Sequence, residues 1–308
     1  ENSTNDEIFE KALKEIRSSC PEGLPSVHDP FSGGGTIPLE AQRLGLTARG
    51  SDLNPVAVVI GKGMIEIPSL FRNNQPIHPS LKKQSSYRNL EGLAEDVEYY
   101  GEWVRENCFN KLRQIYPKVE VPVGIGDDSN KISKNVISWI WARTVPSPDP
   151  AFENTHVPLM SSFLLSNKKN KQVLLKPIID KINQKIEFKI VEDGSKDEIE
   201  IAKIGSSAGK RQGFRCLISG EAITYDYIRK MGQLGLMKHK LVAIVAEGNV
   251  GRVFLPANQE HINAASVHTP DWVPDLALTG KSEECVKYGI TNFSDLFTKR
   301  QLVSLNCI

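Results

Sequence analysis

The sequence predicts an α/β protein in which a short parallel sheet with crossover helices precedes a mainly antiparallel β module. Apolar residues recur at helical spacing in residues 6–19, 37–44 and 55–64, and two short β-like segments, residues 26–29 and 46–52, lie between these helices. This α-β-α-β-α order favours a parallel sheet, because parallel neighbours need a crossover connection. From residue 136 to residue 254, β-like runs separated by polar turns take over, which is typical of antiparallel strands.

The remaining elements follow from the same patterns. Apolar residues step by three or four from Leu93 to Ile115, which predicts a long amphipathic helix. Residues 69–89 are polar and contain proline, so we expect a loop or a disordered link there. Thr298 is a suitable N-cap for a helix over 298–305, and because the chain stops soon afterwards we expect a fragment of a longer protein. Within the module, the predicted strands are residues 136–141, 173–176, 186–191, 198–201 and 241–245.

Composition narrows the class of protein. A chain of 308 residues with 40% hydrophobic and 24% charged content is long enough for about two domains. It has no run of about 18 apolar residues and it begins with polar residues, so we expect no membrane segment and no secretory signal. Five cysteines without a C-x-x-C pair argue against a disulfide framework and fit a cytoplasmic protein. The net charge is +1, so any contact with nucleic acid must come from local patches.

Three consecutive glycines, Gly33 to Gly35, lie between the first predicted strand and the helix that follows it. Such a turn lets the backbone approach a ligand and points free helix N–H groups at it. A nucleoside-triphosphate loop needs a lysine after its glycines, and none follows here. The nicotinamide-dinucleotide fingerprint needs a glycine where the chain has Pro38, although Asp52 stands at the ribose-binding distance of that class. The pattern D-P-F-x-G-x-G, with an acidic residue ending the second strand, is that of S-adenosylmethionine-dependent methyltransferases and fits both halves.

In an open α/β sheet the ligand lies beyond the carboxyl ends of the strands, where Asp29 and Asp52 are both expected. Asp52 can hold two ribose hydroxyls, and the glycine turn can carry the amino-acid end of the cofactor. Thr36 can supply a hydroxyl or cap the helix, and Phe31 can pack beneath the loop. A structural alternative stays open, because such turns also serve tight packing and Asp52 can form an Asx turn or a helix cap. The predicted cofactor-binding residues are Asp29, Pro30, Phe31, Gly33, Gly34, Gly35, Thr36, Asp52, Leu53 and Asn54.

These residues also carry a resemblance to a known family. Residues 29–45 (DPFSGGGTIPLEAQRLG), 51–58 (SDLNPVAV) and 65–68 (IEIP) resemble the large prokaryotic adenine-specific DNA methylases that have an uncharacterised N-terminal domain and a zinc ribbon. The likeness continues in residues 141–145 (WARTV), 243–248 (AIVAEG) and 295–302 (DLFTKRQL). It therefore extends over nearly the whole chain. The resemblance implies a partial Rossmann-like S-adenosylmethionine-dependent methyltransferase core with an inserted β module. It further implies methyl transfer to the exocyclic amine of adenine in double-stranded DNA, and a role in restriction-modification or phage defence.

Two departures from the family pattern bear on function. Relatives hold zinc with the knuckles C-P-x-x-x-C-G and C-P-x-C-G, where this chain has residues 147–152 and 216–220, so only Cys216 of the four cysteines remains. Tetrahedral zinc needs four donors, and we expect no metal site unless His156 and other histidines replace the cysteines. Amino-methyltransferases also act through an Asp/Asn-Pro-Pro-Tyr/Phe loop. The nearest imitation, Asp149 to Phe152, falls on a lost knuckle, so we expect no catalytic residues and a cofactor-binding fragment without turnover.

The predicted organisation has four segments: a cofactor-binding half (1–75), a linker with the long helix (76–130), the inserted β module with its degenerate zinc ribbon (131–265) and a return segment (266–308). Two strands alone make a marginal sheet. We therefore expect either that residues 119–123 or another insert strand complete it, or that the rest comes from a longer parent chain. The expected partners are double-stranded DNA and the missing catalytic part of the same protein, with no membrane.

Two alternative functions remain. One is a nicotinamide-dependent oxidoreductase, against which Pro38 counts. The other is a non-catalytic scaffold that binds DNA or protein. The basic segments 168–171, 238–240 and 299–300 could touch phosphate, although each alone is typical of a solvated turn. Trp139 and Trp141 could stack a base, but their alternation on a β run favours packing. The acidic side of the 93–115 helix does not suit DNA.

Overall fold

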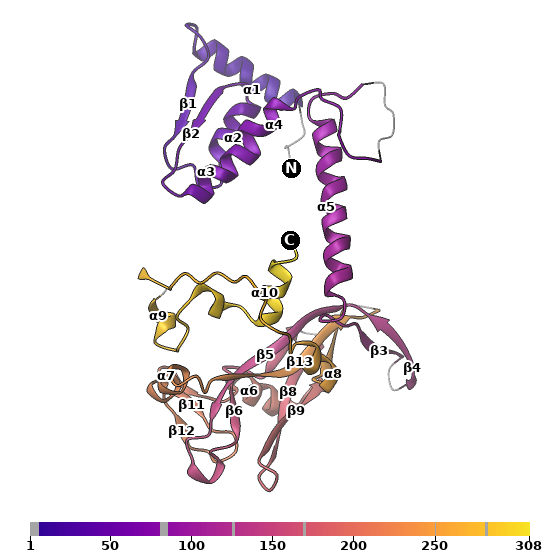
Figure 1. Ribbon diagram of the computed structural model, residues 1–308, viewed down its shortest axis with the longest axis vertical. Coiled ribbons are helices and arrows are strands. Elements are labelled where there is room, and N and C mark those ends of the chain that lie inside the picture. Colours follow the sequence, from indigo (N-terminus) through magenta and orange to yellow (C-terminus); the bar gives the residue numbers. More distant parts are fainter. Residues whose placement is uncertain (1–5, 81–85, 125–126, 169–170, 250, 281–282) are drawn as a thin grey trace. The chain divides into compact units, whose positions relative to one another are not determined.

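The computed structural model describes residues 6–80, 86–124, 127–168, 171–249, 251–280 and 283–308. The chain forms a mixed α/β structure with small sheets, divided into two compact units, residues 1–106 and 107–308 (Figure 1). The predicted parallel and antiparallel parts fall in different units. Among the described residues, no helix is both long and apolar enough to cross a membrane.

The first unit contains the predicted α-β-α-β-α order. Its elements are α1 (Asp6–Ser19), β1 (Ser26–Asp29), α2 (Thr36–Arg43), β2 (Thr47–Gly50), α3 (Pro55–Gly61), a π-helical turn (Lys62–Glu66), α4 (Ile67–Leu70) and the start of α5 (Glu91–Leu112). Strands β1 and β2 pair in parallel, with Val27 opposite Ala48 and Asp29 opposite Gly50. The helix predicted to end near Met64 instead continues to Leu70, and the π-helical turn precedes Pro68, which cannot donate a backbone hydrogen bond.

Residues 77–78, in the segment before α5, are held against this helix by hydrogen bonds. The carboxylate of Asp96 accepts hydrogen bonds from the backbone N–H groups of Ile77 and His78, each at 2.9 Å. The His78 ring stacks on Tyr99 with 4.6 Å between centroids, and its Nε2 lies 3.1 Å from Glu95 Oε1. Acidic residues of the long helix therefore hold this segment in place. Lys82 and Lys83, which belong to the predicted loop, lie outside the described residues.

The second unit is built from small antiparallel sheets. The central sheet has the order β14-β13-β5-β6, and the others are β3-β4, β7-β8-β9 and β10-β11-β12. The strands are β3 (Val119–Gly124), β4 (Asp127–Lys134), β5 (Val136–Pro146), β6 (His156–Leu159), β7 (Leu164–Lys168), β8 (Lys171–Asp180), β9 (Lys185–Glu192), β10 (Ser207–Gly209), β11 (Gly213–Arg215), β12 (Ala222–Ile223), β13 (Lys238–Glu247) and β14 (Arg252–Pro256). The helices are the end of α5, a 3-10 turn (Pro150–Phe152), α6 (Lys196–Ile204), α7 (Tyr225–Gln233), α8 (Gln259–Ala264), α9 (Glu283–Val286), a 3-10 turn (Phe293–Leu296) and α10 (Lys299–Leu305).

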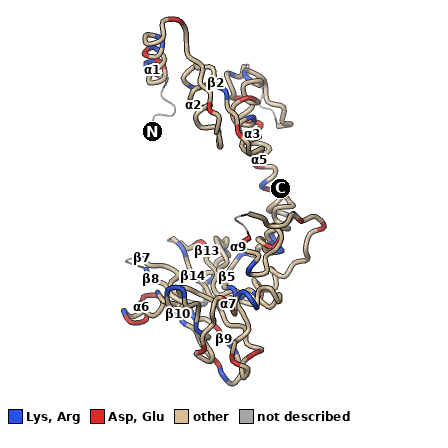
Figure 2. Tube along the Cα trace, turned by 90° about the vertical axis from the view of Figure 1, so that its left-hand side faces the viewer, with Lys and Arg blue, Asp and Glu red and all other residues tan. Residues whose placement is uncertain are grey.

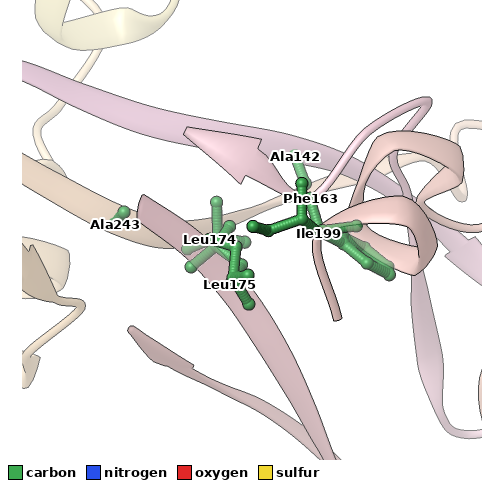
Figure 3. Packing of buried hydrophobic residues seen from close by; sticks show 8 residues of the cluster. Ala142, Phe163, Leu174, Leu175, Ile199 and Ala243 are labelled. Atoms are coloured by element: carbon green, nitrogen blue, oxygen red, sulfur yellow. The ribbon is translucent and has the colours of Figure 1, made fainter. Parts of the chain in front are cut away.

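Buried apolar residues on both sides of the sheets hold this unit together. One cluster joins β5, β8, β13 and α6 through Ala142, Leu174, Ala243 and Ile199, with Phe163 beside them (Figure 3). A second cluster contains Val145, Val157, Ile223 and the buried Cys216. Residues 241–246 of β13 are all buried, which explains why this part of the sequence is a continuous apolar run.

One predicted strand is wrong, and one of the alternatives for completing the parallel sheet is excluded. Residues 198–201, predicted as a strand, lie in α6: Ser195 caps this helix and exchanges hydrogen bonds with Glu198 in a capping box, while Ile199 and Ala202 face the core. Residues 119–123 do not complete the parallel sheet, because they form β3 and pair with β4. The sheet formed by β1 and β2 has two strands in the part of the chain that the structure describes.

Candidate cofactor site at the glycine turn

Backbone hydrogen bonds fix the turn that leads from β1 into α2. The carboxylate of Asp29 accepts from the N–H of Phe31 at 3.1 Å, which starts the turn as an Asx turn. The N–H of Ser32 donates to the carbonyl of Ser51 at 3.0 Å, and the N–H of Ser51 donates to the carbonyl of Asp29 at 2.9 Å. The two segments that follow β1 and β2 are thereby joined at the carboxyl edge of the sheet.

The glycines of the turn are required by conformation and by space. Gly33 has φ 48° and Gly35 has φ 79°, both in the left-handed region that favours glycine. A Cβ on Gly35 would also approach Ile65 Cδ1 at 3.2 Å. Gly35 is the N-cap of α2 and helix α2 begins at Thr36, so the first free N–H groups of this helix lie at the turn.

Asp52 lies directly beside this turn. One carboxylate oxygen accepts from the N–H of Gly33 at 2.9 Å, and the other accepts from the N–H of Asn54 at 2.8 Å. The hydrogen bonds from Asn54 and Gly33 lower the pKa of Asp52, so this carboxylate is ionised at neutral pH. Since an ionised carboxylate has about four acceptor positions, capacity remains for ligand hydroxyls. Asp52 therefore forms the Asx turn that the structural alternative described, and it is also an anionic acceptor at the glycine turn.

The side chains of the other predicted cofactor residues contribute less to the glycine turn than Asp52 does. Phe31 is 84% exposed, so the expectation that it packs beneath the loop is wrong. Thr36 makes no side-chain cap, because Gly35 occupies the N-cap position. Leu53 is 98% exposed, Pro30 and Gly34 are also exposed, and Asn54 caps α3 by accepting from the N–H of Val56 at 3.0 Å. The turn and Asp52 thus form an open cradle rather than an enclosed pocket.

A cavity of about 760 Å³ in the first unit only partly coincides with this cradle. Ser32, Gly35, Gly50 and Ser51 line it, whereas Asp29 and Asp52 do not. We place the candidate site at the carboxyl edge of the strands, because the free helix N–H groups and the ionised carboxylate lie there.

In the second unit, the four positions expected for a zinc ribbon lie near one another, although only one of them, Cys216, is a cysteine. Ser147 Oγ lies 3.3 Å from Cys216 Sγ, and Phe152 packs against the cluster that contains Cys216. The chain turns tightly after Cys216: its carbonyl accepts from the N–H of Gly220 at 2.8 Å, and Gly220 has φ 86°. Burial raises the pKa of the Cys216 thiol, but hydrogen bonds involving Ser147 and Ser219 outweigh burial and the net pKa is lowered. The described residues contain no group of three or more His, Cys, Asp or Glu side chains that could hold a metal ion.

Trp139 packs against other side chains, as its place on a β run favours, and the sequence did not predict that Arg300 would be one of them. The Arg300 guanidinium lies 4.4 Å from the centre of the Trp139 ring and 4.6 Å from that of Tyr116, and it donates to the Ile115 carbonyl at 3.1 Å. Trp139 Nε1 donates to Nδ1 of the fully buried His261 at 2.8 Å. Arg300 is only 6% exposed, so of the basic pair 299–300, which could touch phosphate, Lys299 alone is exposed. A basic residue in an amphipathic helix gave no signal of this packing, which depends on residues more than 150 positions away.

The segment that imitates a catalytic loop has a local structural role. The carboxylate of Asp149 accepts from the N–H of Ala151 at 2.9 Å and caps the short 3-10 turn Pro150–Phe152. This hydrogen bond is the ordinary capping of a polar turn.

Comparison of the chain with protein-family models, with curated proteins and with solved structures gave no match in any of the three.

Proposed function

We propose that the first unit binds S-adenosylmethionine and that the chain is the cofactor-binding part of a DNA adenine methyltransferase. The contact between Asp52 and Gly33 carries this proposal. It joins an ionised carboxylate to a glycine turn at the carboxyl edge of two parallel strands. The carboxylate would accept from the ribose hydroxyls, and the free N–H groups at the start of α2 would bind the carboxylate of the methionine part.

A second observation supports the resemblance to the adenine-specific DNA methylases with a zinc ribbon. The positions where relatives have zinc cysteines are far apart in the sequence, yet Ser147, Phe152, Cys216 and Ser219 come together around one point of the second unit. Their convergence agrees with a zinc-ribbon ancestry in which serine and phenylalanine fill the metal site. This agreement is independent of the glycine turn, because it concerns the other unit.

For this chain the proposal is binding without turnover. The sequence contains no Asp/Asn-Pro-Pro-Tyr/Phe segment, which amino-methyltransferases use to bind and activate the target amine. Methyl transfer would then depend on a catalytic loop supplied by another segment, with double-stranded DNA as substrate. The nicotinamide alternative is weaker, because the position of its third glycine is the buried Pro38 inside α2.

Calorimetric titration with S-adenosylmethionine and S-adenosylhomocysteine tests the proposal. We expect both to bind the wild-type chain, and we expect Asp52→Asn to weaken binding roughly tenfold or more, since a charge-assisted hydrogen bond to each ribose hydroxyl is lost. Asp180→Asn is the matched control. Asp180 accepts from the backbone N–H groups of Ile182 at 3.0 Å and Asn183 at 2.9 Å, but lies in the second unit.

Each outcome of this titration decides between the alternatives. Binding that Asp52→Asn weakens and Asp180→Asn leaves unchanged supports the methyltransferase proposal. Binding of NADH instead would favour the oxidoreductase. Absence of binding by both adenosyl compounds would overturn the proposal and leave a non-catalytic scaffold.

A further inference from the structure

Three cavities of the second unit meet at the start of β13. They measure about 390, 420 and 450 Å³, and His239 lines all three. Six cationic side chains line one or more of them. Arg300 is one of these, but it is buried against Trp139 and Tyr116. We call the other five the basic seam: Arg143, Lys185, Lys238, Lys240 and Lys299.

Strand pairing brings these cations together from distant parts of the sequence. His239 pairs with Arg143 across β13 and β5, and Lys238 pairs with Thr144. Residues alternate between the two faces of a strand, so Lys238 and Lys240 line the 450 Å³ cavity with Lys185 of β9. Arg143 and His239 line the other two cavities with Lys299 at the start of α10. Residues 238–240 of β13 and Lys299 of α10 therefore line adjoining cavities that have His239 in common.

The five cations of the basic seam are not engaged in ion pairs with any described residue. Within the part of the chain that the structure describes, none of its five cations forms an ion pair or donates a side-chain hydrogen bond. Two acidic side chains line the cavities, Glu187 and Asp295. Asp295 already accepts from the backbone N–H groups of Thr291 and Asn292, each at 2.9 Å. By contrast, Lys171 of the other basic turn donates to the Arg252 carbonyl at 2.8 Å and is already engaged.

The positive charge of the seam affects the pKa values of neighbouring histidines. Burial lowers the pKa of His156, and Lys238 lowers it further; burial likewise lowers the pKa of His239, with Arg143 adding to the effect. Burial also lowers the pKa of Lys240, which nearby Glu187 partly opposes. A bound anion would relieve this repulsion. Figure 2 shows lysine and arginine interspersed with acidic residues along the trace.

We propose that the basic seam binds the phosphodiester backbone of a DNA strand, with Trp141 and Phe297 as the apolar wall of the central cavity. This inference rests on the proposed function and names the surface through which the second unit would contact DNA. A DNA strand presents a regularly repeating line of negative charge, so cations spread over three adjoining cavities suit this anion. Trp141 offers an aromatic face for a sugar or an unpaired base beside those phosphates.

Fluorescence anisotropy with a labelled 20-base-pair duplex at several salt concentrations tests this inference on the full chain. We expect the wild type to bind, and Arg143→Gln/Lys238→Gln/Lys299→Gln to bind roughly tenfold or more weakly, with a salt slope reduced by about 3 because three phosphate contacts are lost. The matched control is Lys189→Gln/Lys196→Gln/Lys210→Gln, which removes the same charge from exposed residues that line none of these three cavities. Thermal unfolding of both variants checks that they fold.

The outcomes are distinct. Equal loss of affinity in the two triple variants, or no binding by the wild type, would overturn the seam. Displacement of the duplex by adenosine monophosphate at equal nucleotide concentration would also overturn it, because the site would then take a free nucleotide. Calorimetry with S-adenosylhomocysteine on the seam variant separates the two proposals. If the seam variant loses DNA binding but still binds the cofactor, both proposals are supported. If the wild type binds DNA at the seam but does not bind the cofactor, the proposed DNA-binding surface stands and the proposed function is refuted.

Discussion

At the scale of single residues, the most constrained polar group is His261. It is fully buried, and its Nδ1 accepts from Trp139, so this nitrogen carries no proton in the folded chain. Burial lowers the pKa of His261, and nearby Arg300 lowers it further against the opposing charge of Glu260. The folded state therefore holds this histidine neutral at a pH where the unfolded chain binds a proton.

This difference predicts a pH dependence of stability. Because the folded pKa is depressed, the unfolded chain binds more protons below the ordinary histidine pKa of about 6.5, and the free energy of unfolding falls as pH decreases from about 7 to 5.5. One histidine contributes at most about 1.4 kcal/mol per pH unit. Chemical denaturation at several pH values measures this slope, and His261→Gln should make it shallower. The exposed His268→Gln controls for loss of a histidine, and equal slopes in the two variants would contradict the account.

Residue roles were predictable where they depend on neighbours in sequence. The adjacency of Asp52 and the glycine turn follows from a strand-turn-helix pattern, because the carboxyl ends of neighbouring parallel strands meet at one edge. The burial of Arg300 could not be predicted, since it depends on Tyr116 and Trp139, which only the tertiary fold brings against it. The exposure of Phe31 has the same explanation, because whether a loop side chain packs depends on what lies next to it.

At the scale of elements, α6 shows how local signals compete. The alternation of Glu198, Ile199, Glu200 and Ile201 resembles a half-buried strand over four residues. Ser195 and Glu198 form a capping box, however, and Ile199 and Ala202 are buried at helical spacing. The capping signal is therefore the better predictor here, because a run of four residues cannot separate the two periods. The strands of residues 136–141, 173–176, 186–191 and 241–245 are confirmed, as is the helix capped by Thr298.

The turn after Cys216 leads to a prediction about metal binding. If Ser147, Phe152 and Ser219 occupy former cysteine positions, Ser147→Cys/Phe152→Cys/Ser219→Cys should create a tetrahedral site with Cys216 and bind one zinc ion per chain. Metal analysis after dialysis measures the stoichiometry, and thermal unfolding with and without zinc measures the stabilisation. The matched control adds Cys216→Ser, which leaves three thiolates. Equal zinc content in the two variants, or none in either, would show that these positions do not form a metal site.

At the scale of the whole molecule, the two units differ in how they bury apolar surface. The second unit has two large apolar clusters between its sheets and helices. In the first unit, a two-stranded sheet covers little, and the apolar side chains of Val56, Val59 and Leu70 remain exposed. Since a two-stranded sheet is marginal, we expect weak cofactor binding by this chain. Hydrophobic patterning could predict most elements of each unit and the parallel pairing of β1 with β2. It could not predict which strands of the second unit would pair, because that pairing depends on contacts between distant segments.

Nuclear magnetic resonance tests most directly whether the glycine turn and Asp52 bind an adenosyl cofactor. It measures the chemical shift of each backbone amide with and without the ligand. In ¹⁵N-labelled chain titrated with S-adenosylhomocysteine, we predict the largest shifts at the N–H groups of Gly33, Gly34, Thr36 and Asn54, with little change in the second unit. The carboxylate of Asp52 holds two of these N–H groups, so ribose binding must alter them. Shifts confined to other residues, or none at saturating ligand, would contradict the account.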